Sequence, residues 1–70
     1  MVKQKGRSLG DQVRRAREAA GLIQVEAARR AGMSQSQWSQ IETGDRRNLR
    51  LETLRQMARV LGVPLRDLLD

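Results

Sequence analysis

Residues 24–44 of this 70-residue chain read QVEAARRAGMSQSQWSQIETG, and this segment contains the clearest helix signals in the sequence. Its first part, residues 24–31, is rich in alanine, which favours a helix. Glu26 lies near the start of this segment and Arg29 and Arg30 lie near its end, which is the order of charges that a helix dipole favours. The pattern therefore predicts a short helix over residues 24–31.

A glycine ends this helix, and a capping motif begins the next one. Gly32 stops the first helix, and Ser34 is a favoured N-cap residue. Gln37, three residues after Ser34, completes a capping box, so a second helix is predicted from Gln35 to its end at Gly44. Two short helices joined by a turn of three or four residues form a helix-turn-helix layout, in which the second helix enters the major groove of DNA. Similar hairpins of helices are common, so this layout alone does not decide the function.

Apolar residues on both sides of this stretch continue the helical pattern. They recur at intervals of three and four over residues 9–20 and again over 51–61, and Pro64 suits the first turn of a fifth short helix. The positions concerned are Leu9, Val13, Ala16 and Ala20, then Leu51, Leu54, Ala58 and Leu61, then Leu65, Leu68 and Leu69. We expect an all-α fold of five helices, with residues 1–8 as a flexible basic arm and residues 9–70 as one domain.

Composition excludes several classes of function. The chain has no cysteine and no histidine, so it lacks disulfides, thiolate metal sites and the usual general base at neutral pH. Phenylalanine and tyrosine are absent and there is one tryptophan, which argues against an aromatic platform for single strands. The longest uninterrupted run of apolar residues and glycine, residues 19–23, is too short to span a bilayer. We expect no enzyme activity, no metal, no cofactor and no membrane insertion.

Basic residues lie on both sides of a neutral middle segment. The net charge is +6, and 12 of the 14 basic residues are arginine. Residues 1–10 carry +3 and residues 45–50 carry +2, while residues 23–44 sum to zero. This distribution suggests polyanion contacts on both sides of a segment whose role is something other than attracting charge. The arm, with Lys3, Lys5 and Arg7, would either follow a minor groove or simply float.

The sequence resembles the Cro/cI-type, lambda-repressor-like (XRE) family of helix-turn-helix proteins over residues 8–70. The motifs that carry the resemblance are Leu9-Gly10, Val13-Arg14-x-x-Arg17, Gly21-Leu22-x-Gln24, Ala28, Gly32-Met33-Ser34-Gln35, Trp38-Ser39-Gln40-Ile41-Glu42-x-Gly44, Leu51-x-Thr53-Leu54, Met57-Ala58, Leu61-Gly62-Val63 and Leu68. The resemblance implies a compact five-helix domain that binds double-stranded DNA as a homodimer on a palindromic operator. It also implies a cytoplasmic, nucleoid-associated protein of a bacterium or phage.

The resemblance assigns site residues to two groups. The base-reading residues it implies are Gln35, Ser36, Ser39 and Gln40, and the phosphate-contacting residues are Gln24, Gln37, Thr43, Arg46, Arg47, Asn48 and Arg50. Glutamine can donate and accept at once, which suits a bidentate pair with adenine. A solvated polar helix face would have the same composition, but the flanking basic clusters favour base reading.

Two further roles follow from the resemblance. Gln24 is expected to bind a phosphate while its side chain supports Gln35, although Ile23 replaces the usual serine or threonine N-cap before it. Arg17 and Glu42 are expected to form a partly buried ion pair with a structural role.

Trp38 lies three residues before Ile41, which places it on the inward face of its helix and not against a base. Relatives carry smaller residues at this position and leucine at the position of Ala27. We therefore expect a size exchange, in which the small Ala27 makes room for Trp38 in one shared core.

The sequence thus favours a transcriptional regulator that acts as a repressor, with dimer contacts from Leu65, Leu68, Leu69 and the neighbouring loop surface. The alternative is the antitoxin of a toxin–antitoxin pair, which would bind a toxin and its own operator with the same fold. Residues 51–54 resemble such antitoxins as much as phage repressors, and copurification with a neighbouring gene product would discriminate.

Overall fold

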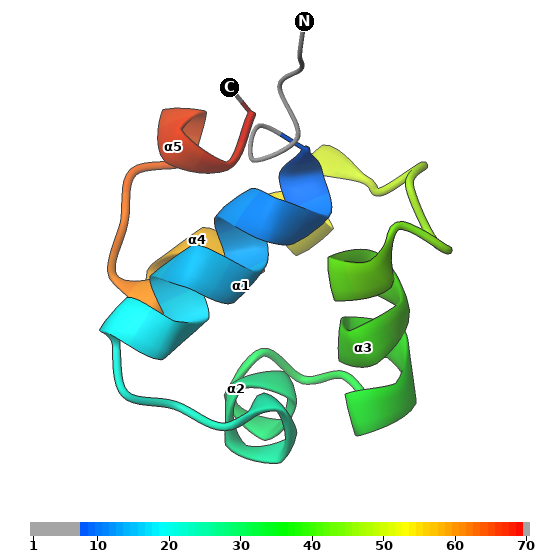
Figure 1. Cartoon of the computed structure of the whole chain (residues 1–70). Helices are drawn as coiled ribbons and strands as arrows, with labels where there is room; N and C mark the ends of the chain where they lie inside the picture. The colour runs from blue at the N-terminus through cyan, green and yellow to red at the C-terminus, as the bar shows by residue number, and fades with distance from the viewer. Residues whose placement is uncertain (1–7, 70) are drawn as a thin grey trace, which may run out of the picture.

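The computed structural model describes residues 8–69, which form five α-helices and no strand (Figure 1). The helices are α1 (Leu9–Ala19), α2 (Gln24–Arg30), α3 (Gln35–Thr43), α4 (Leu51–Leu61) and α5 (Arg66–Leu69). The prediction of an all-α, five-helix fold is confirmed. The predicted basic arm lies outside the described residues, apart from Ser8.

The helix ends follow local signals, with small shifts from the predicted bounds. Ser8, grouped above with the arm, is the N-cap of α1, and its Oγ accepts the Asp11 N–H at 3.1 Å. Ala31 is the C-cap of α2 and not its last residue. Pro64 precedes α5, and its carbonyl accepts the N–H of Asp67 at 3.0 Å.

The helices pack around a single core. Helix α1 lies between α3 and α5 and packs against both, while α2 packs against α3 and α4 (Figure 1). The largest fully buried side chains are Trp38, Ile41, Met57, Leu68 and Val13. Trp38 of α3 is completely buried, so the prediction that it faces inward is confirmed. A small domain depends on such large buried side chains, because burial of apolar surface is its main source of stability.

Ala27 of α2 is also completely buried and belongs to the same core cluster as Trp38. The volume exchange between these two residues stays a prediction, but both positions now lie in the cluster that it requires.

Gly10 lets α1 approach the end of α3 closely. A Cβ atom at this position would lie 2.7 Å from the carbonyl oxygen of Ile41 and closer still to that of Glu42. Backbone atoms cannot move aside as a flexible side chain can, so the absence of a side chain here sets the distance between the two helices.

Candidate nucleic-acid interface

The turn between α2 and α3 is closed at both ends by hydrogen bonds. Gly32 has a φ of +74°, and the Met33 N–H beyond it donates to the Ala28 carbonyl at 3.0 Å. Ser34 begins α3 with a complete capping box, in which its Oγ accepts the Gln37 N–H and Gln37 Oε1 accepts the Ser34 N–H. These contacts fix the start of α3 relative to α2.

The predicted base-reading residues all lie on α3. Gln35 and Ser36, in its first turn, are exposed, and Ser39 and Gln40, one turn later, are half-buried. Gln37 is exposed too, but its amide oxygen is used by the capping box, which leaves its Nε2 for any outside partner.

The only ionisable residue of α3 is Glu42, and its charge is turned inward. The Glu42 side chain is 4% exposed and pairs with Arg17 of α1, whose Nε lies 2.6 Å from Glu42 Oε2. Arg17 Nη2 donates to Oε1 at 3.1 Å, which makes the pair bidentate, and Arg17 Nη1 donates to the Leu22 carbonyl at 2.9 Å. The outward face of α3 is therefore uncharged.

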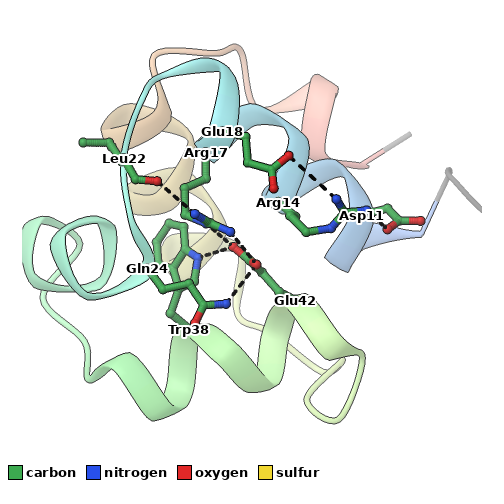
Figure 2. A network of polar contacts seen from close by, with 8 residues as sticks. All are labelled: Asp11, Arg14, Arg17, Glu18, Leu22, Gln24, Trp38 and Glu42. Carbon is green, nitrogen blue, oxygen red and sulfur yellow. Dashed lines mark hydrogen bonds and ion pairs between the residues drawn. The ribbon is translucent and has the colours of Figure 1, made fainter.

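Two further donors complete the shell around Glu42 (Figure 2). Trp38 Nε1 donates to Oε2 at 2.6 Å, and Gln24 Nε2 donates to Oε1 at 3.0 Å. Each carboxylate oxygen thus accepts two hydrogen bonds, which is the full capacity of a carboxylate. No buried side-chain nitrogen or oxygen among residues 8–69 lacks a partner.

The shell of donors decides the charge state of Glu42. Burial alone raises the pKa of this carboxyl group, but the hydrogen bonds from Arg17, Gln24 and Trp38, together with the Arg17 charge, lower the pKa below its ordinary value. The hydrogen bond to Glu42 in turn raises the pKa of Arg17. Both residues are therefore charged at neutral pH.

The position of Gln24 corrects one expectation. Its side chain was expected to support Gln35, but its Nε2 donates to Glu42 instead. The cause is the close packing of α2 on α3, which brings the first residue of α2 to the buried carboxylate rather than to the exposed start of α3. Ile23, before it, makes no side-chain capping bond and is 65% exposed.

The loop after α3 carries the second group of predicted contacts. Arg46, Arg47, Asn48 and Arg50 are all exposed, and none of the three arginines forms an ion pair with another residue in the described part of the chain. Two of these arginines turn back toward α3. Arg46 donates to the side chain of Gln40, and Arg47 Nε donates to the Gly44 carbonyl at 3.0 Å.

Thr43, at the end of α3, is exposed. Its Oγ1 donates to the Gln40 carbonyl at 3.2 Å, so the hydroxyl has to turn away from this carbonyl in order to donate to a phosphate.

The side-chain pairs that sequence reasoning missed include Trp38 with Glu42, Gln24 with Glu42, and Arg46 with Gln40. The first had a signal, because residues four apart in a helix are neighbours and an indole N–H needs an acceptor when it is buried. The other two join residues whose proximity depends on how the helices and the loop pack.

The fold and this arrangement agree with a comparison to known families. Residues 8–70 match the family described as the helix-turn-helix domain. The chain belongs to the helix-turn-helix domain family. This membership makes it a DNA-binding protein of the helix-turn-helix class, with α2 and α3 as the motif. No curated protein matches the sequence significantly.

None of the helices in residues 8–69 is long and apolar enough to cross a membrane. The same residues contain no group of three or more acidic side chains that could hold a metal ion.

Proposed function

We propose that this helix-turn-helix protein is a sequence-specific transcriptional repressor. In this proposal it binds a palindromic operator as a homodimer and inserts α3 of each copy into the major groove. The major groove is wide enough for a helix and presents a distinct pattern of donors and acceptors for each base pair.

One observation carries the proposal: the outward face of α3 is polar and uncharged, and arginines without ion pairs lie directly beyond its end. A base-reading surface needs side chains that donate and accept hydrogen bonds, since charge alone attracts every sequence equally. The burial of Glu42 against Arg17 supports this use, because an exposed carboxylate on α3 would repel phosphates.

The proposed roles divide by position on the helix and loop. Bases are read by Gln35, Ser36, Ser39 and Gln40. Phosphates are held by Gln24, Gln37, Thr43, Arg46, Arg47, Asn48 and Arg50. Gln24 Nε2 donates one of its two N–H groups to Glu42, so in this scheme the second N–H and the backbone N–H groups at the start of α2 remain for the phosphate.

Dimer contacts are proposed to come from Leu65, which precedes α5, and from Leu69 of α5, whereas Leu68, which was also expected to contribute, is buried in the core. Leu69 is 58% exposed although it lies beside the buried Leu68, and Leu65 is half-buried. A patch this small supports weak association in solution, strengthened when two copies bind half-sites about 34–36 Å apart.

Selection from random duplexes at a fixed salt concentration tests the proposal, and the expected result is a symmetric consensus. Leu69→Glu should weaken binding to the full consensus while binding to an isolated half-site stays unchanged. Ser36→Ala, far from α5 in sequence, is the control that should change base preference without changing the dependence on symmetry. An asymmetric consensus, or equal binding of all duplexes, would contradict the proposal.

A further inference from the structure

The chain leaves α3 by a longer path than it leaves α1, α2 or α4. After each of those three helices, an N–H donates to the carbonyl of the residue five positions earlier, as the Leu22 N–H does to the Arg17 carbonyl at 3.1 Å. After Gly44, whose φ is +91°, the corresponding bond reaches back six positions, from the Arg46 N–H to the Gln40 carbonyl at 3.1 Å. The extra residue carries Arg46 back over the last turn of α3.

The side chains of the same two residues are also in contact. Arg46 Nε and Nη2 both donate to Gln40 Oε1, at 3.3 and 3.1 Å. A guanidinium group has only donors, so the amide of Gln40 must present its oxygen to Arg46. Gln40 is thus held by Arg46 through both its backbone carbonyl and its side chain.

This contact changes the hydrogen-bonding character of Gln40. A free glutamine amide offers an acceptor and a donor side by side, which is the pattern that pairs with N6 and N7 of adenine. With its oxygen committed to Arg46, Gln40 offers its Nε2, and Nε2 makes no hydrogen bond to the protein among the described residues.

We propose that Arg46 is a positioning residue that turns Gln40 into a donor-only reader of bases. A donor-only amide selects an edge with two acceptors, O6 and N7 of guanine, over the mixed edge of adenine. This inference rests on the proposed function, since it assigns a base preference to one of the proposed reading residues.

Arg46 keeps enough donors to contact DNA itself. The guanidinium group has five N–H bonds, of which the contact with Gln40 uses two. The remaining N–H bonds and the positive charge suit a DNA phosphate. Arg46 would then contact the phosphate and orient the side-chain amide of Gln40 at the same time.

The test is selection from random duplexes with the full chain and four variants. The base position whose preference disappears in Gln40→Ala is the position that Gln40 reads. There the unaltered protein should prefer guanine over adenine by roughly 5- to 100-fold. Arg46→Ala should bring this ratio close to one, because the released amide can turn and accept from adenine.

Arg46→Lys separates positioning from charge. It keeps the positive charge, so the dependence of binding on salt should stay the same, but a single ammonium cannot hold the amide oxygen as a two-armed guanidinium does. The guanine preference should therefore relax as in Arg46→Ala. Arg47→Ala is the matched control: it should weaken binding to all sequences and leave this preference unchanged.

The outcomes distinguish this inference from the proposed function. Three results would overturn the role of Arg46: an unchanged guanine preference in Arg46→Ala, a preference for adenine in the unaltered protein, or no base preference that depends on Gln40. None of them would contradict the proposed function, provided that the base preference that depends on Gln35 is still observed. If the unaltered protein binds all sequences equally, both the role of Arg46 and the proposed function are wrong. Thermal unfolding followed by circular dichroism should show that all four variants are folded.

Discussion

The indole N–H of Trp38 donates to the carboxylate of Glu42 one turn further along α3, at 2.6 Å. The same tryptophan is completely buried in the core cluster, so a single side chain joins the apolar packing to the polar shell around Glu42. Three other hydrogen bonds reach this carboxylate, from α1 and from α2. Glu42 therefore ties the helix-turn-helix motif to α1.

Trp38→Phe should lower the free energy of unfolding by about 2–4 kcal/mol. A hydrogen bond to a charged group contributes about 1.5–3 kcal/mol, and the smaller ring leaves part of the core unfilled. Urea unfolding followed by circular dichroism measures the loss. A change below about 0.5 kcal/mol would show that the indole N–H contributes little to stability.

Glu42→Gln should cost more, on the order of 3–5 kcal/mol, because Arg17 then keeps a largely buried charge without a counter-charge. The surface pair of Glu26 and Arg30 offers a matched control, and Glu26→Gln should lower the free energy of unfolding much less than Glu42→Gln does, because solvent screens this pair. Urea unfolding of both variants tests the difference. Equal losses would mean that burial of the Arg17 pair does not matter.

The free energy of unfolding should also decrease at acid pH, because Glu42 has a lowered pKa in the folded protein. Its pKa is lower in the folded protein than in the unfolded chain, so the unfolded chain takes up the proton first as the pH falls. The stabilisation is fully present above the unfolded pKa of about 4.5 and is lost as the pH falls through the folded value. The pKa of Glu26 is lowered as well, by hydrogen bonds from Arg29 and Arg30, but solvent screens that surface cluster.

Urea unfolding between pH 7 and pH 3 measures this dependence. The free energy of unfolding should change little between pH 7 and pH 5 and then decrease, and Glu42→Gln should flatten the decrease. A variant with the same acid dependence as the unaltered protein would place the responsible group elsewhere.

Ala27→Leu tests the volume exchange in the core. Ala27 and Trp38 are both completely buried in one cluster, so three added carbon atoms would have to displace a neighbour. Overpacking of this kind costs about 1–3 kcal/mol. Unchanged or improved stability in urea unfolding would count against the exchange.

The order and bounds of the helices could be predicted because their signals are local. The capping box of Ser34 and Gln37 and the spacing of Trp38 and Ile41 each act within a few residues. The contacts of Glu42 are different, since Arg17 is 25 residues away and Gln24 is 18 residues away. Resemblance to a family pointed to Arg17, whereas the position of Gln24 depends on how α2 packs against α3.

The loop after α3 shows the same limit of sequence reasoning. Its arginines could be recognised as a basic cluster, but which of them turns toward α3 depends on the path that the backbone takes after Gly44. The Arg46 N–H returns to the Gln40 carbonyl, and Nε of the neighbouring Arg47 donates to the Gly44 carbonyl.

Base contacts and phosphate contacts should respond differently to alanine. Gln35 is exposed in the first turn of α3 and has no structural hydrogen bond among the described side chains, so Gln35→Ala should leave the fold intact. We expect it to cost about 1–3 kcal/mol of binding free energy at one base position. Arg47→Ala should instead weaken binding to all sequences alike. It should also reduce the slope of the logarithm of the binding constant against the logarithm of the salt concentration by roughly one. Binding to a set of single-base operator variants at several salt concentrations separates the two effects, and a Gln35→Ala protein that discriminates operators as well as the unaltered protein would remove Gln35 from the reading surface.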